Sequence, residues 1–307
     1  MRILIALISF LLLWPAMVIN HTPAEYKSAG LQDEKPILSF GLIADVQYCN
    51  CTPAGTRYYS ASLTKLREAV SGFRISRPEF VINLGDLIER DFESYFPVLD
   101  ILDSSGLKIY HLTGNHDYSV ESGQKKRLPV MHSSKKGYYS FSCKGYRFVA
   151  LNGNEISTYS TVSKKTIDAA AGMIEKLKEK GEPNAMDWNG GIGPSQMKWL
   201  DNQLNEAKSE KESVIIFCHF PAWPENAHNL LNYREILSIL EKHDNILAWF
   251  NGHNHQGNYG YLNKIHFITL KGMVETETTG SYATVEIYSN MIYIKGNGRE
   301  KSRILSI

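Results

Sequence analysis

The feature that most constrains this chain is a repeated pattern in which short apolar runs end abruptly in polar residues. Five such runs, rich in β-branched residues, lie at 37–44, 80–84, 109–113, 214–218 and 246–251. Runs of this length, bounded by glycine or polar residues, are typical of buried strands. Helix-like segments at 62–73, 194–207 and 231–242 stand between them. Strands that alternate with helices predict a largely parallel or mixed sheet with helices covering it.

The polar residues after these runs are candidates for a single functional site. In chain order they are Asp45 and Gln47, Gly85-Asp86, Gly114-Asn115-His116-Asp117, His219, and Gly252-His253-Asn254-His255. In open sheets of this kind, ligands bind beyond the carboxyl ends of the strands, so the five loops are expected to meet there. Each cluster alone has a plainer explanation, since a Gly-Asp pair after a strand is usually a turn. Five clusters at five strand ends favour a common site.

The later part of the chain changes character. Short strand-like runs with tight turns at 259–262, 266–270, 282–288 and 291–295 predict a second sheet packed on the first. The expected fold is α/β, a four-layer αββα sandwich of two mixed sheets flanked by helices. Two longer segments, near 118–137 and 152–193, are expected to be insertions over the site within one domain at 31–307.

The first residues are typical of an export signal. Arg2 precedes an almost continuous apolar run at 3–18, and Thr22 and Ala24 offer a small-x-small cleavage site. The alternative is an uncleaved membrane anchor, although the run is slightly short for a spanning helix. We therefore exclude residues 1–30 from the fold as signal or anchor plus a short linker, and expect a periplasmic or extracellular protein.

Charge and cysteine content exclude several other classes. The net charge is +1, from 33 basic and 32 acidic residues, which gives no sign of a nucleic-acid partner. A small anionic substrate remains compatible, because bound metal ions supply positive charge. Cys49 and Cys51 are too close in sequence for an easy bridge, and Cys143 and Cys218 complete no disulfide framework or zinc motif. Mostly unpaired thiols are expected.

The candidate ligands are oxygen and imidazole donors without a thiolate. They are Asp45, Gln47, Asp86, Asn115, His219, His253 and His255. Such a set suits two divalent cations of intermediate hardness. A carboxylate that bridges both ions would hold them about 3.5–4 Å apart, and the water between them becomes a nucleophile near neutral pH.

The order of these motifs resembles that of the calcineurin-like metallophosphoesterase superfamily. The resemblance implies one metal site formed by Asp45, Gln47, Asp86 and His255, with Asp86 bridging, and a second completed by Asn115, His219 and His253. It also implies that His116 protonates the leaving oxygen or stabilises its charge. Glu89 stands where relatives use aspartate to support that histidine, and Arg90 where they use arginine to grip phosphate.

Gln47 indicates which branch of the superfamily the chain resembles, because most members have histidine at this position. A neutral amide oxygen shifts preference from zinc towards manganese or magnesium. This form is similar to one branch, the manganese-dependent ADP-ribose/CDP-alcohol diphosphatases. The likeness extends over about 37–307, through segments at 40–48, 55–59, 189–200, 232–234, 272–276 and 295–299.

The resemblance to this branch implies hydrolysis of a small nucleotide diphosphate, such as ADP-ribose or a CDP-alcohol, to two phosphorylated products. Two divalent ions are implied, with Mn²⁺ expected and Mg²⁺, Fe or Zn²⁺ as alternatives. Because the chain begins with an export signal, an extracellular or periplasmic nucleotide is the expected substrate. One alternative is a phosphodiesterase or phosphomonoesterase of the same superfamily. A non-catalytic scaffold is the other, against which the complete ligand set argues.

Five further residues are candidate substrate contacts. Arg57, Tyr58 and Tyr59 follow the first polar loop, where arginine suits phosphate and a tyrosine ring suits a base. The alternative is that both tyrosines pack the next helix. Trp223 either walls the pocket or packs in the core, and Arg234 binds a ligand or anchors a loop. The remaining histidines that match no ligand position are expected to be structural or at the surface: His111, His132, His228, His243 and His266.

Overall fold

The computed structural model describes residues 34–128, 136–161 and 163–307. The predicted export signal or anchor lies outside the described residues. Within the described ranges, no helix is both long and apolar enough to cross a membrane.

The first sheet combines three parallel strands with three antiparallel ones. In spatial order its strands are β12 (Arg303–Ser306), β11 (Met291–Gly298), β10 (Ser281–Ile287), β1 (Leu38–Ile43), β2 (Phe80–Asn83) and β3 (Ile109–His111). Strands β1, β2 and β3 are parallel to one another, and β10 to β12 are added antiparallel beside β1. The polar loops after β1, β2 and β3 therefore emerge at the same end of the sheet, where these strands have their carboxyl ends.

The second sheet is mixed in a similar way. In spatial order its strands are β4 (Tyr139–Cys143), β5 (Tyr146–Ala150), β6 (Ser213–Phe217), β7 (Ile246–Asn251), β9 (Ile265–Lys271) and β8 (Gln256–Leu262). The four central strands are parallel, while β4 and β8 are antiparallel edges. The loops after β6 and β7 carry the remaining polar clusters.

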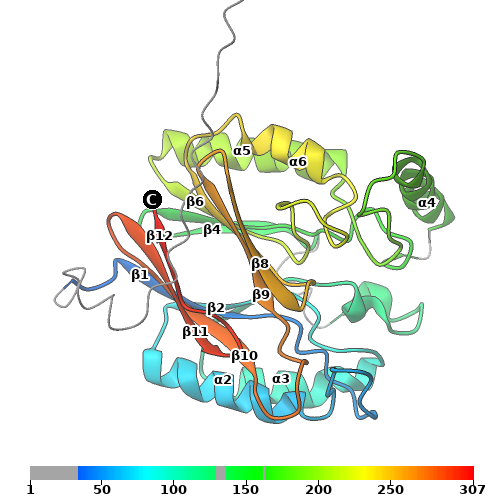
Figure 1. Ribbon diagram of the computed structural model, residues 1–307, viewed down its shortest axis with the longest axis horizontal. Coiled ribbons are helices and arrows are strands. Elements are labelled where there is room, and N and C mark those ends of the chain that lie inside the picture. The colour runs from blue at the N-terminus through cyan, green and yellow to red at the C-terminus, as the bar shows by residue number, and fades with distance from the viewer. Residues whose placement is uncertain (1–33, 129–135, 162) are drawn as a thin grey trace, which may run out of the picture.

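Helices cover the outer face of each sheet. On the first sheet these are α2 (Ser62–Ser76) and α3 (Tyr95–Asp103), which follows the short turn η1 (Phe92–Ser94). On the second sheet they are α5 (Pro194–Ser209) and α6 (Tyr233–Leu240). Figure 1 shows the resulting four layers, with α4 (Lys164–Glu179) standing to one side. The predicted αββα sandwich is confirmed.

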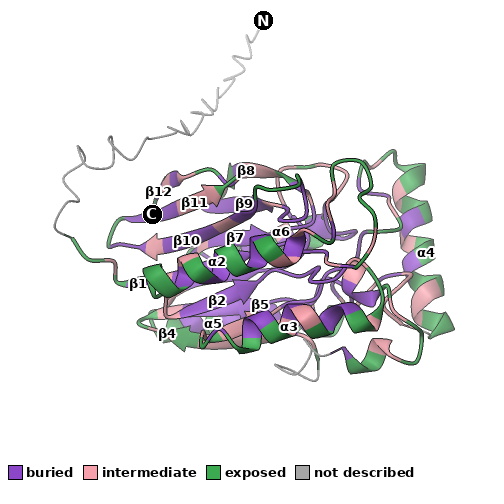
Figure 2. Ribbon diagram, turned by 90° about the horizontal axis from the view of Figure 1, so that it is seen from below, coloured by how far each residue is buried: buried purple, intermediate pink, exposed green. Residues whose placement is uncertain are grey.

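An apolar core between the two sheets fixes the strand ends relative to each other. The Phe40 ring of β1 lies with its centroid 5.5–5.9 Å from those of Phe80, Phe148, Phe217 and Phe250. These rings come from both sheets and are buried. Figure 2 shows the buried residues concentrated on the strands and the exposed ones on the outer sides of the helices. Such close packing leaves little freedom for one sheet to shift on the other.

The prediction that the late strands form a second sheet of their own was wrong. Strands β8 and β9 extend the second sheet beside β7, whereas β10 to β12 extend the first sheet beside β1. The hairpin β4–β5, which was not predicted, forms the opposite edge of the second sheet. Each parallel core is thus completed by antiparallel strands from later or earlier in the chain. The five polar loops consequently come from two sheets, and the site lies between them.

The two predicted insertions contact each other. The first begins at the last residue of the short turn η2 (His116–Tyr118) and contains η3 (Lys125–Arg127), while residues 129–135 lie outside the described part. The second contains α4. Lys125 Nζ donates a hydrogen bond to the Tyr159 carbonyl over 2.6 Å, which joins the two segments. The single-domain organisation at 31–307 stays a prediction.

Candidate metal centre

The loops of the site turn sharply at the residues that carry its polar side chains. Asp45, Gln47, Asp86 and His253 have positive φ angles of 52°, 43°, 57° and 67°. Residues other than glycine seldom adopt this left-handed conformation, and such strain is found mostly at functional sites. Backbone hydrogen bonds hold the turns, including one of 2.9 Å from Gln47 N to the Asp86 carbonyl.

Two glycines allow the carboxylates to come close to neighbouring backbone. A Cβ atom at Gly114 would overlap the Asp86 carboxylate, and one at Gly252 would lie 2.6 Å from Asp45 Oδ2. Glycine is therefore required at these two positions because a side chain would clash with the carboxylates, and not because of the backbone φ angle.

Asp117 supports the loops of the first sheet from behind. Its buried carboxylate accepts hydrogen bonds from the backbone N–H groups of Asp86 (2.9 Å), Leu87 (3.0 Å) and Gly114 (2.8 Å) and from the Tyr95 hydroxyl (2.9 Å). Burial and the nearby Asp86 charge raise the pKa of Asp117 to about 6. The last residue of the Gly-Asn-His-Asp motif thus shapes the site instead of facing into it.

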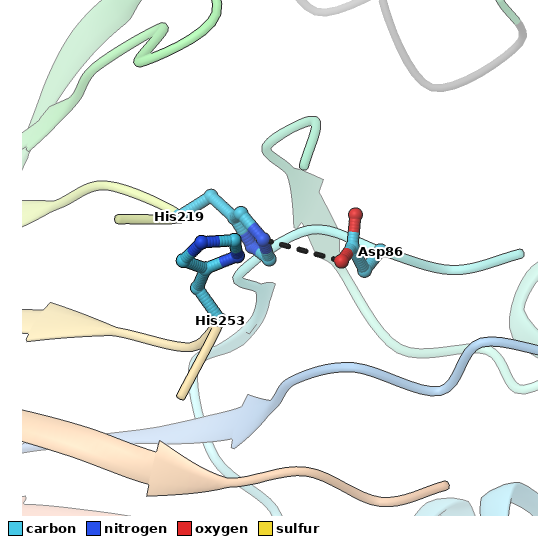
Figure 3. A group of neighbouring side chains, drawn as sticks. All are labelled: Asp86, His219 and His253. Atoms are coloured by element: carbon cyan, nitrogen blue, oxygen red, sulfur yellow. Dashed lines mark ion pairs between the residues drawn. The ribbon is translucent and has the colours of Figure 1, made fainter. Parts of the chain in front are cut away.

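The predicted ligands are brought together from both sheets. Possible ligand atoms of Asp86, His219 and His253 all lie within 4.8 Å of one another, as drawn in Figure 3. His219 Nε2 is 3.3 Å from Asp86 Oδ2, and His255 Nε2 is 3.5 Å from Asp45 Oδ1.

A cavity joins these groups to the remaining predicted ligands. It has a volume of about 400 Å³. Its walls include Gln47, Arg57, Asp86, Asn115, His116, Trp188, His228, His253 and His255.

Unpartnered buried atoms show that the site fits cations. Gln47 Oε1, Asn115 Oδ1 and His219 Nε2 are buried without a hydrogen-bond partner in the described part of the chain. A buried polar atom left without a partner costs about 1–3 kcal/mol, so three in one cluster call for an explanation. Amide oxygen, imidazole nitrogen and carboxylate are together suitable ligands for a divalent ion of intermediate hardness. The donor set therefore fits the metal centre that the sequence predicts.

Each of the three histidines has its other ring nitrogen hydrogen-bonded to an acceptor. His219 Nδ1 lies 2.9 Å from the Leu84 carbonyl, His253 Nε2 lies 2.9 Å from Asn189 Oδ1, and His255 Nδ1 lies 2.8 Å from Glu275 Oε1. Hydrogen bonds of this kind select the tautomer of a metal-binding histidine and orient its ring. When such a ring is neutral, its other nitrogen has a lone pair for the site.

The electrostatics of the cluster favour added positive charge. Burial lowers the pKa values of His219 and His255, but the Asp86 carboxylate raises the first and Asp45 the second, each to about 9. Burial and the His219 charge hold the pKa of His253 well below its usual range. A site that draws protons onto two buried imidazoles also attracts metal cations, which would take the place of those protons.

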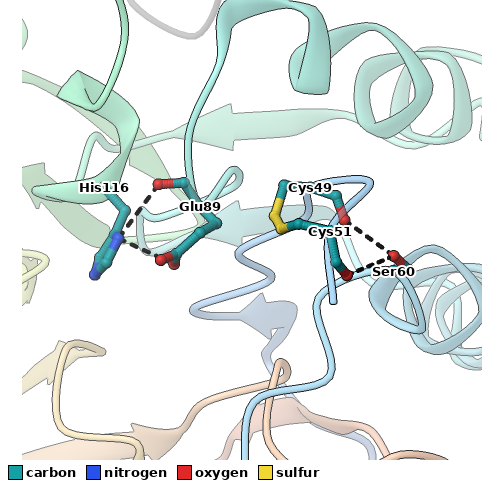
Figure 4. Close-up of a disulfide and its surroundings, with 5 residues drawn as sticks. All are labelled: Cys49, Cys51, Ser60, Glu89 and His116. Carbon is teal, nitrogen blue, oxygen red and sulfur yellow. Dashed lines mark hydrogen bonds and ion pairs between the residues drawn. A yellow bond between two sulfur atoms is a disulfide. The ribbon is translucent and has the colours of Figure 1, made fainter. Parts of the chain in front are cut away.

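His116 and Glu89 are adjacent, as the resemblance implies. His116 Nδ1 is 3.1 Å from Glu89 Oε2 (Figure 4). The backbone N–H of His116 donates to Asp86 Oδ1 over 2.8 Å. Burial lowers the pKa of His116, while the Asp86 and Glu89 carboxylates raise it, to about 9 in total. Arg90 is exposed and is not among the residues that line the cavity. The phosphate contact of Arg90 stays a prediction.

All five predicted substrate contacts lie in the described part of the chain. Of these five residues, Arg57 alone lines the cavity. Its Nε lies 3.9 Å from Glu275 Oε1. Tyr59 is instead buried against Cys49 and Val274. Tyr58 is half-buried, and its backbone N–H donates to the Val274 carbonyl over 3.0 Å. Both tyrosines therefore pack the loop that presents Arg57.

The two other predicted substrate contacts also lie elsewhere. Trp223 packs onto β8, where a Cβ at Gly260 would lie 2.7 Å from its ring. Arg234 pairs with Glu182 (2.9 Å) and Glu225 (3.0 Å) and is mostly exposed. It anchors loops, and neither residue lines the cavity.

Sequence reasoning missed four residues at this site. Trp188 and His228 line the cavity, a position that the expectation of a structural or surface role for His228 did not include. Asn189 and Glu275 bond the distal nitrogens of His253 and His255. Asn189 and Glu275 lie in two of the segments that resemble the family, and this resemblance was the only sequence signal that could have indicated them. Nothing near His228 in the sequence marks it, since the fold alone brings it beside His253.

The expectation for Cys49 and Cys51 was also wrong, because the structure pairs them in a disulfide (Figure 4). The loop curls so that their Cα atoms lie 5.3 Å apart, inside the range that a bridge requires. Ser60 Oγ lies 3.2 Å from the Cys49 carbonyl and 3.1 Å from the Cys51 carbonyl, as a donor to both. Cys143 and Cys218 are unpaired.

Comparison with known proteins identifies the family. A family model described as calcineurin-like phosphoesterase matches residues 38–257, which include every predicted metal ligand. The chain belongs to the calcineurin-like phosphoesterase family. This phosphoesterase is 28% identical over 326 residues to the manganese-dependent ADP-ribose/CDP-alcohol diphosphatase of Xenopus tropicalis, across 89% of this chain and 95% of that protein. It is 28% identical over 307 residues to the Arabidopsis thaliana protein of the same name, across 89% and 98%.

Solved structures agree with this assignment. A dimetal phosphatase from Danio rerio superposes with a TM-score of 0.79 at 27% identity, covering 89% of this phosphoesterase and 99% of that chain. The GAP50 anchor of the Plasmodium inner membrane complex has a TM-score of 0.52 at 14% identity, covering 88% and 89%. The latter likeness concerns the fold alone.

Proposed function

We propose that this phosphoesterase hydrolyses the phosphoanhydride bond of small nucleotide diphosphates of the ADP-ribose and CDP-alcohol type. The observation that carries the proposal is the group of unpartnered buried ligand atoms around Asp86, which opens into a cavity with Arg57 on its wall. Relatives named for this reaction align with nearly all of the chain outside its first residues.

Two divalent ions, with Mn²⁺ as the expected metal, would be held by the seven predicted ligands. When bound, they supply charge that polarises the phosphoryl oxygens and makes a water molecule acidic enough to act as nucleophile. Gln47 Oε1, a neutral amide oxygen where an imidazole would favour zinc, supports the choice of manganese.

The chain's own residues orient the substrate and move one proton. Arg57 lies on the cavity wall, where its guanidinium can contact phosphate oxygens in a bidentate manner. In the reaction the water oxygen bonds to one phosphorus while the bond from that phosphorus to the bridging oxygen breaks. His116 bonds Glu89 through Nδ1, so its Nε2–H is the group that gives a proton to the departing phosphate oxygen. Because phosphate is already a good leaving group, charge stabilisation should contribute more than this proton.

The cavity suits a small molecule. Its volume of about 400 Å³ lies within the range typical of ligand sites in proteins, about 300–1,000 Å³. The exposed ring of Trp188 and the imidazole of His228 stand on its wall and offer contacts for the organic part of a nucleotide.

We also propose that the protein is exported, so that it acts on nucleotides outside the cytoplasm. Arg2 and the apolar run at 3–18 support this. N-terminal sequencing of protein recovered from the periplasm or medium would test both export and cleavage. Recovery from the cytoplasm alone would reject export, and recovery with membranes, unprocessed, would favour the anchor.

The test of the activity is ADP-ribose hydrolysis by metal-stripped protein to which Mn²⁺, Mg²⁺ or Zn²⁺ is restored separately. We expect Mn²⁺-dependent release of AMP and ribose 5-phosphate, lost in His116→Ala. Turnover of a simple diester or monoester without anhydride cleavage would retain the site and reject the substrate class. Failure on all three substrate types with every metal would favour a non-catalytic scaffold.

A further inference from the structure

Asn189 is a buried asparagine that contacts a predicted metal ligand. It lies in the loop between α4 and α5 and is 0% exposed. Its Oδ1 is 2.9 Å from His253 Nε2. Its Nδ2 donates to the carbonyls of Asn184 (3.0 Å) and Ala227 (2.7 Å).

These contacts leave one orientation for the Asn189 amide. A carbonyl oxygen can only accept a hydrogen bond, so the group facing the Asn184 and Ala227 carbonyls must be the NH₂. Oδ1 consequently faces His253 and can only accept. His253 Nε2 must therefore carry the hydrogen, which leaves the lone pair of its ring on Nδ1.

We infer that Asn189 is a positioning residue that fixes the tautomer and ring orientation of His253, so that Nδ1 is the nitrogen offered to a metal ion. The inference relies on the proposed function only in taking His253 as a metal ligand. Partners of this kind typically change metal affinity by about 10–100-fold when they are replaced.

Asn189 also ties the cavity wall to this ligand. Its neighbour Trp188 lines the cavity, and Ala227, whose carbonyl it binds, precedes His228 on the same wall. The His228 ring lies 5.4 Å from the His253 ring, centroid to centroid. The Asn189 amide thus connects two segments of the cavity wall to His253. An experiment must therefore distinguish a role in holding the wall together from a role in positioning His253.

Asn184 provides the matched control. It is equally buried and lies in the same loop, and its Nδ2 donates to the carbonyls of Leu230 (2.7 Å) and Leu231 (3.4 Å). It contacts no predicted metal ligand. The Asn184 carbonyl, which accepts from Asn189 Nδ2, belongs to the backbone and is retained in Asn184→Leu. The variant therefore removes a comparable side-chain tie between the same two loops and leaves the acceptor for His253 in place.

The experiment reads the tautomer and metal binding without any substrate. Metal-free protein labelled with ¹⁵N-histidine is examined by long-range ¹H–¹⁵N NMR, with the His253 signal assigned by its loss in His253→Gln. Mn²⁺ affinity is measured from the EPR signal of the free ion. For Asn189→Leu we expect mixed tautomers at His253 and Mn²⁺ binding weaker by about 10–100-fold. For Asn184→Leu we expect the Nε2–H tautomer and an affinity within about twofold of the wild type, as for changes outside the coordination network.

Equal loss of affinity in both leucine variants, or an unchanged tautomer and affinity in Asn189→Leu, would overturn the inference. If Asn189→Leu does not fold, the wild-type spectrum still decides, because an Nδ1–H tautomer at His253 in the metal-free protein contradicts the proposed role. Loss of the diphosphatase activity alone would bear on the proposed function and would leave these readouts unaffected.

Discussion

The two sheets contribute chemically different halves to the site, and each half is held in place by different means. The first sheet supplies what we call the oxygen half, Asp45, Gln47, Asp86 and Asn115. The second sheet supplies the imidazole half, His219, His253 and His255. The oxygen half is held largely by the backbone, since Asp86 Oδ1 accepts from His116 N (2.8 Å) and Asp45 accepts from His253 N (3.1 and 3.2 Å).

The imidazole half depends more on side chains. Leu84 contributes a backbone carbonyl to His219, but Asn189 and Glu275 bond their histidines through side-chain oxygens. A backbone N–H is kept in every substitution except that by proline, whereas a side-chain acceptor is lost in most substitutions. Apart from Asp117, whose carboxylate holds the backbone of Asp86 and Gly114, the ligands of the oxygen half should be sensitive mainly to their own replacement. In the imidazole half, His253 and His255 should also be sensitive to replacement of the side chain that each ring bonds.

The largest effect should follow from changing the oxygen half directly. In Asp86→Asn the central carboxylate loses the charge that the ions and the histidines share, so we expect kcat to fall by about a thousandfold or more, equivalent to several kcal/mol. Steady-state kinetics at saturating Mn²⁺ measure this. Asp91→Asn, which changes an exposed carboxylate nearby, should leave kcat within about twofold. A small effect at Asp86 would contradict the central place given to this half.

Removal of the proton donor should have the next largest effect. His116→Ala deletes the imidazole while the His116 backbone N–H still holds Asp86, so we expect kcat to fall by about 10²–10⁴-fold with little change in metal affinity. Parallel measurements of kcat and of Mn²⁺ binding separate the two quantities. A fall in Mn²⁺ affinity as large as the fall in kcat would show that the side chain, not the backbone, supports the oxygen half.

A neighbour of the imidazole half should come next. Glu275→Gln weakens the acceptor that orients His255, and we expect Mn²⁺ affinity to fall by about 10–100-fold. Glu277→Gln, an exposed change two residues further on, serves as the control. Binding by Glu275→Gln equal to that of the control would break the distinction between the two halves.

The last effect concerns the support of that neighbour and is measured in folding stability instead of metal binding. Lys65 is buried, and its ammonium donates to the carbonyls of Val274 (3.0 Å), Glu275 (3.4 Å) and Thr276 (2.9 Å). Burial, with a smaller contribution from the Arg299 charge, lowers its pKa to about 8. Between pH 8 and about 10.4 the unfolded chain keeps the Lys65 proton that the folded chain has lost, so stability rises with pH across this window.

Lys65→Met removes this contribution. The free energy of unfolding of the wild type minus that of the variant should therefore grow from pH 7.5 to pH 10, by roughly 1–3 kcal/mol. Urea titrations at the two pH values measure the difference, in which other titrating groups cancel. A difference independent of pH would mean that Lys65 keeps its ordinary pKa in the folded chain.

The elements that could be predicted are those whose signal is local. Strand β7 was predicted at its observed bounds, and β1, β2 and β6 within one or two residues at either end, because a continuous apolar run with a polar stop is a strong pattern. The hairpin β4–β5 escaped because β4 is an edge strand whose residues are half-buried, which leaves little contrast between its faces. The assignment of late strands to sheets failed since pairing depends on contacts far apart in sequence.

The same distinction between local patterns and long-range packing applies to the site. The ligand types and their order along the chain are local chemistry, so the sequence was enough to indicate a two-metal phosphoesterase. The places of Trp188, His228, Asn189 and Arg90 were decided by the fold, because each depends on how loops from two sheets pack after the core has formed. A residue's chemistry belongs to its side chain, but the partners that tune it are chosen by packing.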